Sequence, residues 1–325
     1  MHLFILDAIK LMPWLVSIIS LMKPGYKNVK NNKKLIVPFA EWIKDRNLYV
    51  VDRFLNATCS VAYGGAVYSA FEDISMIYPL KIGILDLKTR PTTYFHGNLS
   101  QINEGYQEVW NVISKKHNII FKSNITNISR DQNKIVIKHS GDETSEYDYL
   151  IIACNLTGML EILDTTEEEE EIFSKVKHVG SWKAVFIAKD LPTDAGYVFL
   201  DQLESPDVKP ALSGFIPEGQ VGDGKYLYTT VLGLTTEDGF EEVIKNSNEL
   251  LEEHFNASEI EWVDNTYWPE YHSHFESKEI KNGIFDKFEL MQGKNNTFYV
   301  GEILSGISNG LSMDYSFDLV DRFFV

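Results

Sequence analysis

Gly301 and Glu302 are the pair of residues with the clearest chemical use in the sequence. They follow a short apolar run, residues 297–300, and precede a glycine-bearing segment and an amphipathic pattern that predicts a helix ending at residues 319–324. A glycine at this point lets the backbone approach a ligand closely, a helix start presents free N–H groups, and a carboxylate accepts hydrogen bonds from hydroxyl groups. The pair therefore predicts a site for a polyol chain or a pyrophosphate. A plain turn without a ligand is the alternative, because Gly-Glu turns are common.

Two strands are expected to hold this turn in place. Residues 147–155, YDYLIIACN, contain a continuous apolar run between polar residues, which is typical of a parallel strand buried on both faces. Residues 297–300 predict the second strand. The shorter elements predicted just upstream are a helix over residues 99–116 with Gly105 at its entrance, and strands over residues 118–129 and 133–140, the latter turning through residues 140–142.

A second group of segments predicts an antiparallel sheet. Proline, glycine and acidic residues separate these segments, which favours hairpins over crossover connections. The predicted strands cover residues 181–190, 196–203, 210–217 and 225–233. The predicted helices cover residues 236–255, and residues 35–56 with a break near Asn47. The acidic run over residues 165–171 is expected to be a solvated helix start or loop.

Charge and the N-terminal segment exclude some classes of partner. The formal net charge of −17 argues against nucleic acid as a partner. Asp7 and Lys10 interrupt the first apolar run, and the run that follows, residues 11–22, is shorter than the ~20 apolar residues of a membrane span. We therefore expect a packed helix and no integral membrane segment, with a peripheral membrane anchor and an export signal as the alternatives. Two cysteines are too few for a disulfide framework, so we expect a cytoplasmic protein.

Several segments, in this order, resemble the flavin amine oxidase superfamily of FAD-dependent enzymes, which also includes dehydrogenases, desaturases and isomerases of apolar substrates. They are EGYQEVW, NIIFKSNITNISRDQNKIVI, YDYLIIAC, and FYVGE followed by YSFDLVDRFF. PFAEWIKDRNL, YPLKI, YWPEYH and ELMQGKNNTFYVGE are similar to a branch described as FAD-dependent oxidoreductases or amine oxidase-like proteins. The resemblance covers residues 35–324.

The resemblance implies an α/β fold of mixed α+β type, in which an incomplete FAD-binding Rossmann-like domain is interleaved with an antiparallel-sheet substrate domain. The implied segments are residues 1–97 (helical, substrate side), 98–160 and 276–325 (FAD-binding domain) and 161–275 (substrate domain). FAD is the implied cofactor. The implied cofactor-binding residues are Ile125 at the adenine, Ala153 beneath the dinucleotide, Gly301 and Glu302 at the ribityl chain, and Asn309 and Gly310 in the turn near the isoalloxazine. A plain strand-core role is the alternative for Ile125.

The implied activity is hydride transfer from a small apolar or amine substrate to flavin, with no catalytic residue that can be named. The family begins with a G-x-G-x-x-G turn, and this sequence contains none. One alternative is therefore a non-catalytic fragment or pseudoenzyme that has lost FAD binding and binds a ligand or partner. Another is a truncated gene product whose upstream frame encodes the turn. The strand at residues 147–153 would lack its neighbours, and an unpaired edge and exposed apolar face there lead us to expect aggregation or self-association.

Two further groups of side chains suggest a substrate pocket and a metal site. Aromatic residues that could line a substrate pocket, or simply pack in the core, are Tyr63, Tyr68, Tyr78, Tyr94, Trp268 and Tyr271. His272 and His274, with Glu270 and Glu276, could imitate a metal site. Their spacing would need a strand and more ligands, so no metal is expected.

Overall fold

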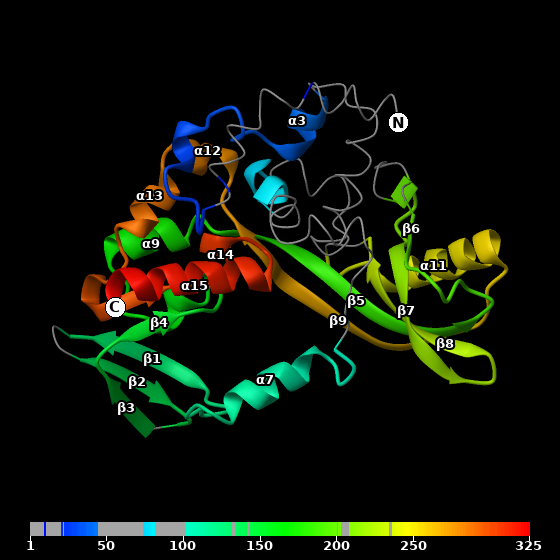
Figure 1. Ribbon diagram of the computed structural model, residues 1–325, viewed down its shortest axis with the longest axis horizontal. Helices are drawn as coiled ribbons and strands as arrows, with labels where there is room; N and C mark the ends of the chain where they lie inside the picture. Colours follow the sequence, from blue (N-terminus) through cyan, green and yellow to red (C-terminus); the bar gives the residue numbers. More distant parts are fainter. Residues whose placement is uncertain are drawn as a thin grey trace.

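A computed structural model of the chain describes residues 10, 21, 23–44, 74–81, 102–131, 134–141, 143–199, 201–202, 208–233 and 236–325. Figure 1 shows sheets and helices intermixed, which confirms the predicted mixed α/β fold with an antiparallel sheet. The predictions for most of residues 1–25, for the break near Asn47, and for Tyr63, Tyr68 and Tyr94 fall outside the described residues. No helix within the described ranges has the length and apolar character needed to cross a membrane.

Strands β4 (Leu150–Ile152) and β10 (Thr297–Tyr299) pair in parallel, with Leu150 opposite Thr297 and Ile152 opposite Tyr299. This pairing confirms the prediction of a parallel strand in residues 147–155. The prediction that the strand is buried on both faces is wrong, because the Ile151 side chain is 50% exposed. Ile151 lies on a face of β4 that the described part of the chain leaves half uncovered, which agrees with the exposed apolar face expected where the strand lacks its neighbours.

The larger sheet is antiparallel and has the order β6-β7-β8-β5-β9. Its strands are β5 (Lys177–Lys189), β6 (Tyr197–Val198), β7 (Leu212–Gly222), β8 (Lys225–Leu232) and β9 (Ser258–His274). The four predicted strands are all present, although β6 is short. Strand β9 was not predicted: it is an edge strand with mostly exposed side chains, so its sequence has no continuous apolar run. Figure 1 shows β5 and β9 running side by side from this sheet toward α12 and α14.

A third sheet is formed by β1 (Ile125–Arg130), β2 (Ile135–His139) and β3 (Glu143–Tyr147), all antiparallel. The predicted turn between β2 and β3 is present, with positive φ at Ser140 and Gly141. The prediction of a strand over residues 118–129 is only partly right, because β1 begins at Ile125. Residues 118–122 are exposed and form no strand.

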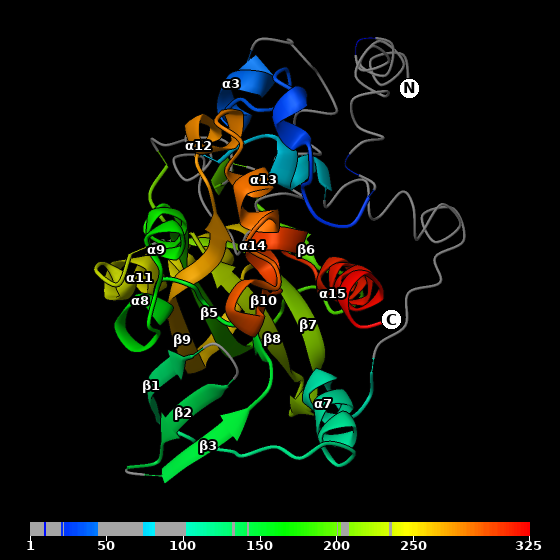
Figure 2. The ribbon, with the colours of Figure 1, turned by 90° about the vertical axis from the view of Figure 1, so that its left-hand side faces the viewer.

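Helices and short 3-10 turns pack around these sheets. They are η3 (Val29–Asn31), α3 (Phe39–Lys44), α7 (Tyr106–Ser114), α8 (Met159–Ile162), α9 (Glu167–Phe173), α11 (Phe240–Phe255), α12 (Ser277–Lys281), α13 (Ile284–Glu289), η5 (Lys294–Asn296), α14 (Glu302–Ser305) and α15 (Asn309–Phe323). The helix predicted over residues 236–255 begins only at Phe240, because Gly239 just before it has a left-handed backbone. Figure 2 shows α14 near β10, α15 to its side, and α13 and then α12 farther from β10.

Within the described residues, these elements enclose two hydrophobic cores. One lies between α11 and the five-stranded sheet and contains Phe186, Phe215 and Leu251. The other joins the segments before and after α3 to the C-terminal helices, and Trp42 and Tyr315 are among its buried residues. The described N-terminal and C-terminal segments therefore share one core.

Helix α7 was predicted from an apolar face, and that face is exposed. None of its residues is buried, and Tyr106, Trp110 and Ile113 are large exposed hydrophobic side chains. Together with Phe121 and Ile151 they leave considerable apolar surface in contact with water. Such surfaces promote association.

We expect Trp110→Glu to reduce self-association of the protein. The substitution places a charge on the exposed apolar face of α7, and charge on such a face opposes association. Sedimentation velocity over a range of protein concentrations measures the effect. Gln107→Glu, which adds the same charge to the same helix without removing an apolar side chain, is the control. A wild-type protein that stays monomeric at every concentration would contradict the expectation.

Candidate functional site

The carboxyl ends of β4 and β10 bring three predicted residues together. Ala153 follows β4, and Gly301 follows β10 after a backbone hydrogen bond of 3.0 Å from Val300 N–H to the Ile152 carbonyl. A Cβ atom on Gly301 would lie 3.5 Å from the Ala153 carbonyl oxygen. Gly301 has φ of 108°, a region that side-chain-bearing residues rarely adopt. In open sheets with parallel strands, ligands bind outside this carboxyl edge.

Glu302, the first residue of α14, is held by two donors from the end of β9. His272 Nδ1 lies 2.7 Å from Glu302 Oε1, and the backbone N–H of Ser273 also donates to the carboxylate. Burial raises the pKa of Glu302 to about 7, although the Ser273 N–H and the charges of His178 and His274 act in the opposite direction. Burial also lowers the pKa of His272 well below 6.5, so its imidazole is neutral at pH 7 and, once Glu302 is ionised, is assigned the tautomer that donates through Nδ1–H.

A β-bulge produces this arrangement. Lys177 pairs with His274 and Val179 pairs with Tyr271, so His272 and Ser273 together stand opposite the single residue His178. Bulges turn consecutive side chains in directions that regular strands do not allow. His272 accordingly has φ of 53° and points at Glu302, while Ser273 Oγ lies 3.3 Å from His178 Nδ1.

The loop after β4 is tied to the same region of β9. The Asn155 amide nitrogen donates to the Glu270 carboxylate. Asn155 Oδ1 accepts from both the backbone N–H and the hydroxyl of Thr157, each at 3.1 Å. Thr157 Oγ1 lies 3.4 Å from His178 Nε2. These contacts fix the loop that follows Ala153 relative to the bulge.

Tyr78 is buried in the core next to the bulge. Of the two predictions for Tyr78, core packing is therefore the one that the structure supports. Its ring meets the His272 and His274 rings edge-on, with centroids 5.9 and 6.2 Å away, and its hydroxyl accepts from the Phe275 N–H at 2.7 Å. Trp268 is exposed and Tyr271 is half-buried. Among the described residues, no group of three or more His, Cys, Asp or Glu side chains could hold a metal ion.

Comparison with known proteins gives a match at the level of solved structures. No protein-family model and no curated protein matches the sequence. A CLA-producing fatty acid isomerase from P. acnes is 26% identical, with a TM-score of 0.77 over 94% of this chain and 70% of that chain. The chain has the fold of the flavin amine oxidase superfamily. Putrescine oxidase bound to putrescine (10% identical, TM-score 0.65, 97% and 75% covered) and cyclohexylamine oxidase from Brevibacterium oxydans (12%, 0.57, 95% and 75%) share it. The resemblance predicted from the sequence is thereby confirmed.

The other predicted cofactor-binding residues, Ile125, Asn309 and Gly310, lie away from the β4–β10 edge. Ile125 is the first residue of β1, opposite His139, and its side chain is exposed. The alternative of a buried strand-core role for Ile125 is therefore wrong. Asn309 and Gly310 are exposed at the start of α15, where Ser308 caps the helix by accepting from the Leu311 N–H at 3.1 Å. A hydroxyl contact of 2.9 Å between Ser305 and Ser312 links this helix start to α14.

The turn between α14 and α15 also contacts a buried amine that sequence reasoning missed. A Cβ atom on Gly306 would lie 3.2 Å from the Tyr26 hydroxyl and 3.8 Å from Lys81 Cδ. Lys81 Nζ donates to the carbonyls of Lys23 and Gly25, the former at 3.1 Å. Burial lowers the pKa of Lys81 to about 7. Lys81 therefore ties the segment before η3 to this turn of the amine oxidase fold.

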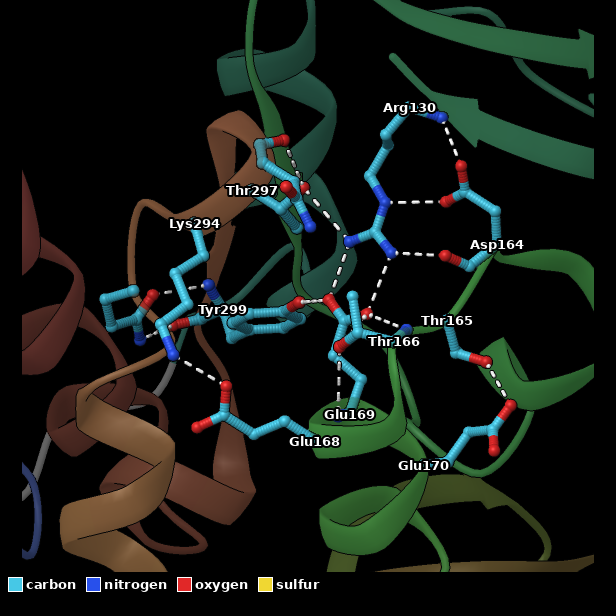
Figure 3. Close-up of polar contacts among 12 residues, drawn as sticks. Arg130, Asp164, Thr165, Thr166, Glu168, Glu169, Glu170, Lys294, Thr297 and Tyr299 are labelled. Carbon is cyan, nitrogen blue, oxygen red and sulfur yellow. Dashed lines mark hydrogen bonds and ion pairs between the residues drawn. The ribbon is translucent and has the colours of Figure 1, made fainter. Parts of the chain in front are cut away.

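A buried ion pair that was not predicted from the sequence lies beside Tyr299 of β10 (Figure 3). The guanidinium of Arg130, at the end of β1, donates to both carboxylate oxygens of Glu169 at 2.6 and 2.8 Å and to Asp164 at 2.7 Å. The Tyr299 hydroxyl of β10 donates to the same Glu169 carboxylate. Burial acts to raise the pKa of Glu169, but the hydrogen bonds from Arg130, Tyr299 and Thr166 outweigh it and lower the pKa to about 2.

The interpretation of residues 165–171 needs a correction. They do begin a helix, α9, but Glu169 is buried rather than solvated. The physical reason is a capping box: the Thr166 side chain accepts from the Glu169 N–H, and the Glu169 carboxylate accepts from the Thr166 N–H. The T-x-x-E spacing in the sequence was the signal that could have identified this residue.

Proposed function

We propose that the protein is a FAD-dependent oxidoreductase of the amine oxidase-like type. The observation that carries the proposal is the meeting of Ala153, Gly301 and Glu302 at the carboxyl edge of the parallel strands β4 and β10. When bound, FAD supplies the oxidising chemistry, because its flavin accepts a hydride from the substrate.

The residues at this edge fit part of the cofactor. Glu302 would accept a hydrogen bond from a hydroxyl of the ribityl chain, and the absence of a side chain at Gly301 would allow the cofactor to approach the backbone. Asn309 and Gly310, at the start of the 15-residue helix α15, would face the isoalloxazine. The backbone of Ile125 would contact the adenine.

The proposed substrate is a small apolar molecule, with an amine as the second class. The match to the fatty acid isomerase is 26% identical, whereas the putrescine oxidase match is 10% identical. This difference supports an apolar, fatty-acid-like substrate over an amine. The role of this chain's own residues in that reaction is to hold and orient the cofactor and the substrate.

Flavin retention tests the proposal. We expect purified protein, incubated with FAD and desalted, to keep the visible absorption bands of a bound flavin. At pH 8, where Glu302 is ionised, Glu302→Gln should then weaken FAD binding by about tenfold or more, because a hydrogen bond to a charged acceptor is lost. Quenching of flavin fluorescence measures the dissociation constants.

Thermal stability separates this effect from misfolding. Folding raises the pKa of Glu302 from 4.5 to about 7. The folded state therefore binds a proton at Glu302 more tightly than the unfolded state, and ionisation of Glu302 lowers the free energy of unfolding as the pH rises from 4.5 to 7. Glu302→Gln should therefore keep or raise the melting temperature at pH 8. Glu161→Gln, an exposed carboxylate on α8, is the matched control and should bind FAD like the wild type. A folded wild-type protein that retains no flavin would overturn the proposal in favour of a non-catalytic binding module.

A further inference from the structure

The end of β9 presents two consecutive hydrogen-bond donors to one carboxylate. His272 contributes Nδ1–H and Ser273 contributes its backbone N–H, and both reach Glu302. In a regular strand, adjacent side chains point to opposite faces of the sheet. The bulge opposite His178 removes that constraint, so the convergence of the donors depends on it.

The backbone at His272 adopts an unfavourable conformation. Its φ is 53°, in the left-handed region that side-chain-bearing residues occupy mainly where their surroundings hold them there. The imidazole is 1% exposed, its ring stacks on that of His274 with a centroid distance of 5.5 Å, and the Tyr78 ring packs edge-on against it. These contacts fix the orientation of the ring and therefore the direction of its Nδ1–H.

Glu302 depends on such support. It is the first residue of the four-residue helix α14, and its side chain is 31% exposed, so the helix alone fixes its carboxylate poorly. A carboxylate can accept about four hydrogen bonds, so two donors from the bulge leave capacity for a ligand hydroxyl. Because His272 is neutral above pH 7, where Glu302 is ionised, it orients the carboxylate without forming an ion pair that would neutralise it.

We propose that His272 is a positioning residue for the cofactor, which holds the Glu302 carboxylate in the orientation that accepts a hydrogen bond from a hydroxyl of FAD. This inference rests on the proposed function and deepens it, because it adds to that site a residue which does not itself touch the cofactor. The bulge and the left-handed backbone at residue 272 are the structural means by which β9 delivers the donor.

Two substitutions with opposite properties test the proposal. His272→Phe keeps the ring and its stacking but removes the donor, and we expect the dissociation constant of FAD to rise about 3- to 10-fold. His272→Asn loses the ring, but its amide nitrogen occupies the place of Nδ1, and asparagine tolerates positive φ. We expect it to bind FAD within about twofold of the wild type, because the donor is kept.

A second readout does not depend on FAD. Carbon-13 NMR of labelled glutamate carboxyl groups reports the titration of Glu302, and its pKa should rise in His272→Phe and return toward the wild-type value in His272→Asn. The titratable groups that face or contact Glu302 are His178, His272, His274, Tyr26, Tyr78 and Tyr271. His254→Phe, an exposed histidine at the end of α11, is the control and should change neither quantity.

The outcomes distinguish this inference from the proposed function. Wild-type protein that holds no FAD overturns the proposed function and this inference with it. If the wild type binds FAD and folded His272→Phe binds it equally well with an unchanged Glu302 titration, only the positioning role is overturned. If His272→Phe does not fold, His272→Asn still decides, because a folded His272→Asn protein that binds FAD as weakly as Glu302→Gln contradicts the role.

Discussion

Replacing Arg130 with methionine is expected to lower the free energy of unfolding by about 3–5 kcal/mol. The substitution leaves the Glu169 carboxylate buried without its guanidinium, and the two side chains are only 2% and 5% exposed. Most of this loss comes from the unpaired buried charge of Glu169. The intact ion pair itself stabilises the fold little more than a pair of apolar side chains of similar size would. Urea denaturation followed by circular dichroism measures the loss.

The double variant Arg130→Met, Glu169→Gln shows whether the buried charge is responsible. Glutamine keeps an acceptor for the Tyr299 hydroxyl and carries no charge, so we expect the double variant to recover a substantial part of the loss. Glu168→Gln is the control: its ion pair with Lys294 is exposed and should contribute less than about 1 kcal/mol. An Arg130→Met protein that loses less than about 1 kcal/mol would show that solvent reaches Glu169.

The same ion pair sets an acid limit on stability. The pKa of Glu169 is lowered to about 2 from 4.5, so its stabilising contribution is complete above pH 4.5 and is lost as the pH falls toward 2. In Glu169→Gln this part of the acid dependence should disappear. The unfolding free energies of wild type and variant should therefore converge between pH 4.5 and 2.

Phe186→Ala is expected to destabilise the protein by about 3–5 kcal/mol through the other core. Phe186 is fully buried on β5 of the five-stranded sheet, stacked on Tyr228 with ring centroids 5.2 Å apart and packed against Trp262 with centroids 5.0 Å apart. Alanine would lose the transfer free energy of the ring and leave a cavity. Phe317→Ala, an exposed phenylalanine on α15, should change stability by less than about 0.5 kcal/mol.

Tryptophan fluorescence and circular dichroism together show whether the two cores unfold as one. In a background with Trp14, Trp42 and Trp110 replaced by phenylalanine, the remaining tryptophans, Trp182, Trp262 and Trp268, all lie on strands of the five-stranded sheet. Strands β5 and β9 connect this sheet to the part of the chain that contains Glu302. We expect Phe186→Ala and Arg130→Met in this background each to shift both signals by the same amount. If Phe186→Ala shifts only the tryptophan signal, the five-stranded sheet is an independent folding unit.

Local patterns were sufficient to predict β4, β10 and the Gly301-Glu302 turn, because an apolar run and a glycine define each of them within a few residues. Local patterns failed where the outcome depends on partners distant in sequence. Arg130 and Glu169 are 39 positions apart, and their pairing follows from how β1 packs on α9. The direction of His272 follows from a register shift between two long strands, which no spacing in its own segment encodes.

The left-handed backbone at residue 272 also limits which residues the position can hold. Glycine would relieve the backbone strain, because it adopts positive φ without a steric penalty. It would also delete a buried imidazole that packs on His274 and Tyr78 and reaches Glu302, and so leave a cavity. Asparagine tolerates positive φ and keeps a donor, so it is the replacement that meets both the backbone and the hydrogen-bond requirement.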